Sequence, residues 1–264
     1  MTRKALTIHQ LDAMKRDGEK IAMLTCYDAT LARTMDLAGV DIVLVGDSLG
    51  MVVQGRASTV GVTLADIAYH VDCVAHGLER AFLLGDMPFG SYCDGPTAMA
   101  GAVRLMSAGA AMVKLEGAGP MIDVVDYLTR RGVAVCGHLG LTPQSLHQLG
   151  GFKVQARDEA AVERLLLDAQ ALEAAGAQML VVECVPSAVG REVSSRLRIP
   201  VIGIGAGAGC DGQVLVMHDM LGLGERAPKF VADFMAGAGT IAGAFEAYVL
   251  AVREGRFPAP EHEY

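Results

Sequence analysis

The feature that most constrains the fold of this chain is an alternation of short apolar runs with helical patterns, repeated eight times. Each run is rich in branched residues and about five residues long, as in parallel strands that are covered on both faces. The predicted strands are Ile21–Cys26, Asp41–Val45, Ala81–Leu84, Ala111–Leu115, Val133–Cys136, Met179–Val182, Val201–Ile204 and Gln213–Met217. Eight strand–helix units in series predict an α/β fold, a single (β/α)8 barrel of the TIM type.

Amphipathic stretches separate these runs, and the one that contains Leu165, Leu166 and Leu172 has its apolar residues on a single helical face. The predicted helices are Ala29–Leu37, Leu64–Leu78, Pro96–Ala108, Met121–Arg131, Glu159–Ala175 and Ala188–Leu197. Pro228–Arg253 is expected to hold the outer helix or helices after the eighth strand, interrupted near Gly237 and Gly239. We expect one domain over 1–264, with a short helix at about 8–17 before the first strand.

A doubly wound open sheet is the alternative fold, and its first strand–helix turn normally carries a glycine-rich phosphate loop. Here that turn reads Tyr27-Asp28-Ala29, which favours the barrel. A later stretch, Gly207–Gly212, matches G-x-G-x-x-G, but the predicted strand Gln213–Met217 follows it. Because a dinucleotide site needs a helix amino terminus at that point, we reject a dinucleotide-binding function.

Composition narrows the class of protein. The net charge of −8, with no basic cluster, argues against nucleic acid as a partner. No apolar stretch reaches the length of a membrane span, and the amino-terminal residues lack the apolar segment of a secretory signal. The six cysteines stand apart, without C-x-x-C spacing, as small core residues do in cytosolic proteins. We therefore expect a cytoplasmic globular enzyme.

Polar residues stand where the predicted strands end. In chain order these are Tyr27-Asp28, Asp47-Ser48, Asp86, Lys114 with Glu116, His138, Glu183 and His218-Asp219. The carboxyl ends of barrel strands form one rim, which carries the active site in enzymes of this fold. Residues this far apart in sequence are therefore expected to line one site.

Two of these residues, Asp47 and Asp86, belong to neighbouring strands and offer two carboxylates close together. Magnesium prefers one or two carboxylates and leaves its other positions to water and substrate oxygens. Glu116 is a candidate for a further ligand or for a residue that holds a metal-bound water. The competing interpretation of Asp47 is that it caps the helix that follows it.

The remaining candidates each have two interpretations. Lys114 lies two residues before Glu116 and so on the same face of its strand, where it could bind a substrate carboxylate or form a Schiff base. Glu183 follows an apolar strand and is either a general base or a buried, hydrogen-bonded acid. His138 either donates to the substrate or satisfies a neighbouring acid. His70, His76 and His147 fall on helical patterns and are not assigned to the site.

Several blocks of this sequence resemble the ketopantoate hydroxymethyltransferase family. They are LVGDSLGMVVQG (44–55), the turn at 86–89, MVKLEG (112–117), VCGHLGLTPQ (135–144), GAQMLVVECVP (176–186) and VIGIGAG (201–207). The resemblance extends over about residues 5 to 256. It implies a barrel of the phosphoenolpyruvate/pyruvate superfamily. It also implies transfer of a hydroxymethyl group from 5,10-methylenetetrahydrofolate to 3-methyl-2-oxobutanoate, the first step of pantothenate biosynthesis.

The resemblance also implies roles for single residues. Asp47, Asp86 and Glu116 match the family's Mg²⁺ site, and Glu183 matches its proton acceptor. Asp47, Ser48, Asp86 and Lys114 match the residues that bind the 2-oxoacid. The implied reaction passes through a magnesium-stabilised enolate. The expected partners are the 2-oxoacid and the reduced folate, within a homo-oligomer, a decamer.

Three other functions compete with this one. A lyase or mutase of the same superfamily tends to carry a cysteine in the loop after the fifth strand, where this chain has Leu139-Gly140-Leu141. The second is an aldolase with a Schiff base at Lys114. The third, from a different class, is a non-catalytic 2-oxoacid-binding barrel, against which the intact set of acids argues.

Overall fold

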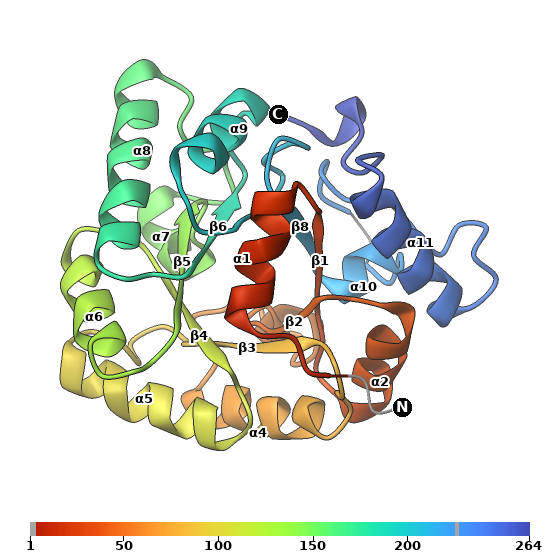
Figure 1. Cartoon of the computed structure of the whole chain (residues 1–264), viewed down its shortest axis with the longest axis horizontal. Coiled ribbons are helices and arrows are strands. Elements are labelled where there is room, and N and C mark those ends of the chain that lie inside the picture. The colour runs from red at the N-terminus through yellow and green to blue at the C-terminus, as the bar shows by residue number, and fades with distance from the viewer. Residues whose placement is uncertain (1–3, 225–226) are drawn as a thin grey trace.

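The computed structural model describes residues 4–224 and 227–264, and its centre is a closed barrel of eight parallel strands (Figure 1). Each strand pairs with the next in sequence, and β8 pairs with β1, where Ile21 lies opposite Gly212. The predicted (β/α)8 barrel is therefore confirmed. The strands are β1 (Ile21–Thr25), β2 (Ile42–Val45), β3 (Phe82–Asp86), β4 (Met112–Glu116), β5 (Val135–Gly140), β6 (Met179–Glu183), β7 (Val201–Ile204) and β8 (Gly212–Leu215).

Helices surround this barrel and begin at side chains that suit a helix amino terminus. Asp28, Asp94 and Asp158 each accept hydrogen bonds from backbone N–H groups of the first turn. None of the helices of 4–224 and 227–264 is long and apolar enough to cross a lipid bilayer. The helices are α1 (Ile8–Asp17), α2 (Ala29–Ala38), α3 (Leu49–Val52), α4 (Leu64–Ala75), α5 (Gly95–Ser107), α6 (Pro120–Thr129), η1 (Pro143–Ser145), α7 (Leu146–Leu149), α8 (Glu159–Ala174), α9 (Ser187–Arg196), α10 (Met217–Met220), α11 (Ile241–Arg253) and η2 (Pro260–His262).

Several predicted bounds differ from the structure by a few residues, and three of the differences concern whole segments. β5 continues past Cys136 to Gly140, because its pairing with β6 extends to the end of that strand. β8 ends at Leu215, and α10 begins at Met217, whose N–H donates to Thr25 Oγ1. Within Pro228–Arg253, the structure places a helix only from Ile241 onward. Gly237 and Gly239 lie in the non-helical stretch before α11, where an interruption was predicted. Both have positive φ angles, a backbone conformation that an α-helix does not contain.

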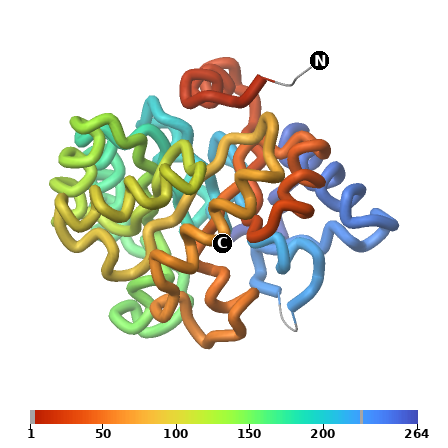
Figure 2. The backbone as a smooth tube through the Cα atoms, turned by 90° about the horizontal axis from the view of Figure 1, so that it is seen from below, coloured from red at the N-terminus to blue at the C-terminus, as the bar shows by residue number. Residues whose placement is uncertain are grey.

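The amino-terminal end of the barrel is covered by α1. Leu11 of this helix is buried, and Lys15 Nζ lies 2.6 Å from Asp211 Oδ2, just before β8. Figure 2 shows α1 at one end of the molecule, with the segments after β2, β5 and β8 at the other. The α1 helix therefore covers the amino-terminal ends of the strands, and the segments after β2, β5 and β8 lie at their carboxyl ends.

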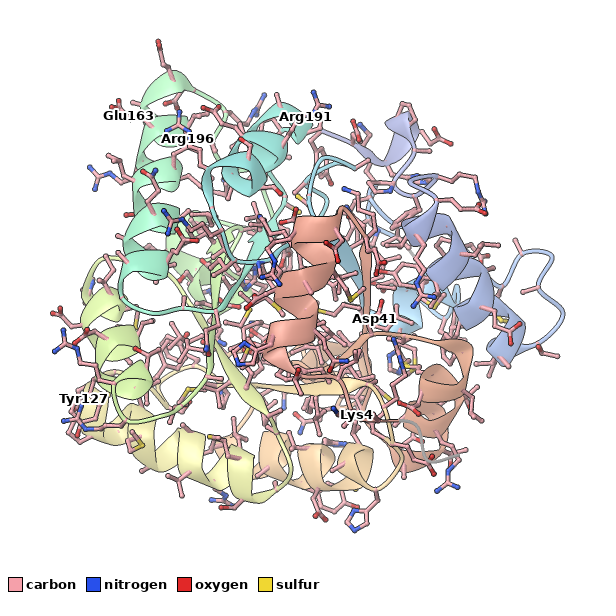
Figure 3. All side chains as sticks on the ribbon, in the orientation of Figure 1. Lys4, Asp41, Tyr127, Glu163, Arg191 and Arg196 are labelled. Atoms are coloured by element: carbon pink, nitrogen blue, oxygen red, sulfur yellow. The ribbon has the colours of Figure 1, made fainter. Side chains whose placement is uncertain are left out.

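The same covered end holds a buried ionic cluster around Asp41, beside α1 (Figure 3). Its Oδ1 lies 2.6 Å from an Arg80 nitrogen and 3.1 Å from an Arg253 nitrogen, and its Oδ2 accepts from the Ala22 N–H at 3.0 Å. The carboxylate is fully buried, so these donors offset the free-energy cost of taking its charge out of water. The cluster joins β1, the residue before β2, the residues before β3 and the end of α11.

Helix α11 packs against the seam where β8 pairs with β1 and contacts both strands through Tyr248. The buried Tyr248 hydroxyl lies 2.9 Å from the Met23 carbonyl of β1 and 2.8 Å from the Gln213 carbonyl of β8. Beyond α11, the residues from Phe257 to Tyr264 turn back toward the carboxyl end of the barrel. There the Ser187 N–H, at the start of α9, donates to the Tyr264 carbonyl at 3.0 Å.

Candidate active site

A pocket of about 660 Å³ opens at the carboxyl ends of the strands. Its walls come from residues near the ends of all eight strands and from the segments that follow β2, β5 and β8. The strand-end residues that line it include Asp47, Ser48, Asp86, Lys114, Glu116, His138 and Glu183, whereas Tyr27, Asp28 and His218 do not. Polar residues from the ends of five strands therefore share one pocket.

The register of the barrel explains this convergence. Asp86 of β3 lies opposite Lys114 of β4, and Glu116 of β4 lies opposite His138 of β5. Side chains alternate between the two faces of a strand, so Lys114 and Glu116 share the inner face. One inner patch thus receives two acids, a lysine and a histidine from three consecutive strands.

Lys114 of β4 is held in this patch by Asp86 of the neighbouring strand β3 and by Glu116 of its own strand. Its Nζ donates to Asp86 Oδ1 at 2.7 Å and lies 3.6 Å from Glu116 Oε1. Burial alone would lower the pKa of Lys114, but the charges of Asp86, Glu116 and Asp47 outweigh burial and raise it. The amine is therefore a fixed positive charge at the floor of the pocket.

Asp47 brings a carboxylate into the same patch and leaves part of it unpaired. Its N–H donates to Asp86 Oδ2 at 3.2 Å, while its own buried Oδ2 has no hydrogen-bond partner in the described part of the chain. Burial, followed by the charges of Asp86 and Glu116, raises the pKa of Asp47 to about 8. Asp47 does not cap the following helix, because α3 starts after Ser48 and has no side-chain cap.

Glu116 is anchored on several sides. Its Oε2 accepts from the Gln144 N–H at 3.0 Å, and its Oε1 lies 3.2 Å from His138 Nδ1. Burial would raise the pKa of Glu116, but Lys114 and His138 outweigh it and lower the pKa. This acid is ionised and held in place, as suits a residue that orients others.

His138 links Glu116 to Glu183. Its Nε2 lies 3.2 Å from Glu183 Oε2, although the two groups are not aligned as a hydrogen bond. Burial and Lys114 lower the pKa of His138, but its contacts with Glu116 and Glu183 outweigh them and raise it to about 9. Of the two interpretations of His138, the geometry supports contact with neighbouring acids.

The backbone around Glu183 is tightly constrained. Gly140 lies opposite Glu183 in the β5–β6 pairing and has a φ of +89°. A Cβ atom at position 140 would lie 2.2 Å from the Glu183 carbonyl oxygen. The next residue, Cys184, adopts a φ of +48°, which is uncommon for a residue other than glycine. The chain therefore turns sharply immediately after Glu183.

Ser48 is the remaining predicted binding residue. Its Oγ lies 2.7 Å from the Tyr27 hydroxyl, which fixes the serine at the edge of the pocket. Asp28, beside Tyr27, caps α2 and does not line the pocket. His218 and Asp219 lie in α10 rather than at a strand end, and of these two only Asp219 lines the pocket.

Two residues that the sequence analysis missed support the acid cluster. The Tyr92 hydroxyl donates to Gln144 Oε1, and Gln144 Nε2 donates to the Met87 carbonyl at 3.0 Å. The Glu116 N–H also reaches the Tyr92 hydroxyl at 3.4 Å. Both residues lie outside the strands, where no periodic pattern marks them. Gln144 could have been found only through the block 135–144, at whose end it stands.

The fit to a divalent cation can be judged from these contacts. No three His, Cys, Asp or Glu side chains of residues 4–224 and 227–264 are arranged so that all could hold one metal ion. The patch nevertheless brings three carboxylates to one lysine and leaves Asp47 Oδ2 without a partner. Such an excess of buried negative charge fits a cation whose remaining ligands are water and substrate oxygens.

Comparison with known proteins gives the family. The family model described as ketopantoate hydroxymethyltransferase matches residues 5–260. The chain belongs to the ketopantoate hydroxymethyltransferase family. It is 57% identical over 260 residues to the 3-methyl-2-oxobutanoate hydroxymethyltransferase of Thiobacillus denitrificans, covering 98% of this chain and 99% of that one. The enzyme of the same name from Xanthomonas campestris is 57% identical over 263 residues, covering 99% and 97%.

Solved structures share the fold of this family member at low sequence identity. Phosphoenolpyruvate phosphomutase from Streptomyces platensis subsp. rosaceus matches with a TM-score of 0.62 and 16% identity, covering 97% of this chain and 92% of that one. A phosphonopyruvate hydrolase in complex with oxalate and Mg²⁺ matches with a TM-score of 0.61 and 12% identity, covering 97% and 93%. At these identities the likeness shows the barrel fold alone.

Proposed function

We propose that this hydroxymethyltransferase transfers a hydroxymethyl group from 5,10-methylenetetrahydrofolate to 3-methyl-2-oxobutanoate. The products are 2-dehydropantoate and tetrahydrofolate, and the reaction is the first step of pantothenate biosynthesis. The names of its relatives support the acceptor. The observation that carries the proposal is Glu183, which stands at the same pocket as a buried Asp47–Asp86–Lys114 cluster.

Asp47 and Asp86 are the residues that would hold Mg²⁺. The unpaired Oδ2 of Asp47 supports a ligand role for that residue. Glu116 already contacts His138 and Gln144, which suits an orienting role around the ion, as the outer-shell interpretation of this residue predicts. When bound, the ion supplies Lewis-acid polarisation of the keto group.

The oxoacid itself would be bound by charge and by hydrogen bonds. Lys114 is the buried cation nearest the two aspartates and would attract the substrate carboxylate. The Ser48 hydroxyl, held by Tyr27, would donate to a substrate oxygen. Lys114 keeps its proton because its pKa is raised, and a Schiff base requires a neutral amine. This disfavours the aldolase interpretation.

Glu183 would remove the proton from C3 of the bound oxoacid. His138 Nε2, 3.2 Å from the Glu183 carboxylate, keeps that carboxylate oriented toward the pocket. The C3 carbanion, delocalised as the enolate, then forms a carbon–carbon bond to the one-carbon unit of the folate, opened to its iminium. The bond between the folate nitrogen N5 and the transferred carbon would then break as a water oxygen bonds to that carbon, which gives the hydroxymethyl group. N5 would take the second proton of that water, and N10 would take the proton removed from C3.

Hydrogen–deuterium exchange tests this proposal. The protein is incubated with Mg²⁺ and 3-methyl-2-oxobutanoate in deuterium oxide, with and without 5,10-methylenetetrahydrofolate, and both reactions are followed by NMR. We expect exchange at C3 without folate, and 2-dehydropantoate only with it. Exchange without product would overturn the proposed co-substrate. If neither exchange nor product formation occurred, the result would favour the non-catalytic 2-oxoacid-binding barrel. If borohydride trapped a covalent adduct of the oxoacid at Lys114, the result would favour the Schiff-base aldolase.

We also propose that the protein forms a homo-oligomer of ten subunits. Leu37 of α2 and Ile241 and Leu250 of α11 expose large apolar side chains on outer helices that pack against each other. Light scattering after size-exclusion chromatography measures the mass in solution. A monomer at micromolar concentration would contradict this part of the proposal.

A further inference from the structure

The pocket is larger than the proposed acceptor needs. At roughly 30 Å³ per non-hydrogen atom, the share of a water molecule in the liquid, the eight such atoms of 3-methyl-2-oxobutanoate take about 240 Å³. The pocket has about 660 Å³. The acid cluster accounts for most of the charged residues that line it, and most of the other lining residues are apolar. The remaining volume, with its largely apolar walls, can therefore accept part of a second molecule.

Aromatic side chains line this remaining volume. Phe152, in the segment after α7, lines the pocket and is 55% exposed. Tyr264 lines it from the carboxyl-terminal segment and packs edge-on against Phe230, with ring centres 6.5 Å apart, while Lys229 Nζ lies over one face of the Tyr264 ring, 5.3 Å from its centre. An aromatic ring left open to a cavity offers a flat face to a flat ligand. Packing within a single copy of the chain does not explain why the Phe152 side chain is exposed.

Both segments are attached to the loop that follows Glu183. The Gln155 N–H, three residues after Phe152, donates to the Cys184 carbonyl at 2.8 Å. The Ser187 N–H donates to the Tyr264 carbonyl at 3.0 Å. The segments that carry the two aromatic residues are therefore bonded to the loop that leads from the proposed base, and all three line the same pocket.

A lysine accompanies these rings. Lys153 lines the pocket beside Phe152, is exposed, and makes no ion pair with any described side chain. In a chain of net charge −8, an unpaired cation at the pocket entrance favours a ligand that carries carboxylates. The second molecule should therefore be flat at one end and anionic at the other.

We propose that Phe152 and Tyr264 form the binding surface for the bicyclic ring of the reduced folate, and that Lys153 binds the carboxylates of its glutamate tail. This inference rests on the proposed function, because it assigns the co-substrate of that reaction to named residues. Ring stacking orients the one-carbon unit toward the C3 carbanion, and the lysine fixes the direction in which the tail leaves the pocket.

Steady-state kinetics of Phe152→Ala and Tyr264→Ala test the aromatic surface. We expect each variant to raise the KM for 5,10-methylenetetrahydrofolate by roughly tenfold, as the loss of one stacked ring does elsewhere. The KM for the oxoacid and the rate of C3 exchange should stay within about twofold. Tyr264→Phe keeps the ring and should behave as the parent enzyme. Tyr69→Ala removes an aromatic residue that is 66% exposed on α4 and does not line the pocket, so it is the matched control.

Lys153→Ala tests the proposed contact between Lys153 and the glutamate tail of the folate. The parent enzyme should bind a triglutamyl folate more tightly than the monoglutamate, and the variant should lose most of that difference. Unchanged folate KM values in all three alanine variants would overturn the inference. An equal loss of C3 deuterium exchange and of hydroxymethyl transfer in these variants would also overturn the inference, because it would indicate general damage to the site. A parent enzyme that exchanges C3 but never transfers from folate refutes the proposed function instead, and the two failures are thereby distinguished.

Discussion

At the scale of single residues, the acids of the pocket differ in how they are held. The Asp86 and Glu116 side chains are only 1% and 2% exposed and are tied to Lys114, His138 or Gln144, whereas the Glu183 side chain is 13% exposed. The contact with His138 leaves Glu183 open to the pocket on its other side. The two buried acids are thus fixed in position by their partners, whereas the more exposed Glu183 is the one that a substrate could reach.

This difference leads to a prediction for Glu183→Gln. The amide keeps the size of the side chain but cannot accept a proton, so C3 deuterium exchange should fall by about 10²- to 10⁴-fold. Oxoacid binding, measured by calorimetry in the presence of Mg²⁺, should stay within about threefold of the parent protein. Rapid residual exchange in this variant would rule out Glu183 as the base.

Asp86→Ala should have two effects. It removes a proposed Mg²⁺ ligand and leaves the buried Lys114 ammonium without its closest partner. We expect weaker binding of both Mg²⁺ and oxoacid in calorimetric titrations. We also expect a loss of about 3 kcal/mol in the free energy of unfolding, from denaturant titration. Asp72→Ala, at an exposed acid on α4, is the control for both measurements. A Mg²⁺ titration that Asp86→Ala leaves unchanged would contradict the ligand role.

At the scale of elements, the strands were predictable because each must be apolar on both faces, which leaves a clear run of residues such as Ile42–Val45. The pocket residues within or directly after those strands were predictable for the same reason, since a polar side chain such as Lys114 has no packing role in such a run. Tyr92 and Gln144 were missed because irregular segments carry no period. His218 was misplaced because the branched residues of β8 continue into the turn before α10.

The seam between β8 and β1 gives a prediction at this scale. Tyr248→Phe removes one hydroxyl that contacts carbonyls of both strands and leaves the two carbonyls in an apolar setting. The free energy of unfolding should fall by about 1–3 kcal/mol, as measured by urea denaturation. Phe245→Leu, one turn away on α11 and also buried, is a packing control without a hydroxyl. An unchanged urea midpoint for Tyr248→Phe would show that the two contacts do not stabilise the seam.

At the scale of the whole molecule, the two ends of the barrel have different tasks. The covered end contains α1 and the Asp41 cluster, and the open end contains the pocket (Figure 2). Within residues 4–224 and 227–264, no hydrogen bond or ion pair of Asp41 involves a residue of the pocket, although Asp41 directly precedes β2, the strand that leads to Asp47. Stability and chemistry are thus assigned to opposite ends of the same strands.

This separation predicts the behaviour of Asp41→Ala. Arg80, Arg253 and the Ala22 N–H lose their shared acceptor, so the free energy of unfolding should fall by about 3 kcal/mol. C3 exchange per folded molecule should remain within about twofold of the parent. Arg130→Ala, which breaks an exposed pair on α6, should change stability by less than about 0.5 kcal/mol. A large loss of exchange in Asp41→Ala would show that the two ends are coupled.

Gly140 has a consequence that reaches beyond this chain. Any side chain at that position would collide with the carbonyl of Glu183, and its backbone conformation already suits glycine alone. A distant relative with another amino acid there must have shifted the end of β6, and with it the proposed base. Position 140 therefore offers a simple criterion for judging, among sequences of uncertain kinship, which ones have kept the geometry needed for proton removal.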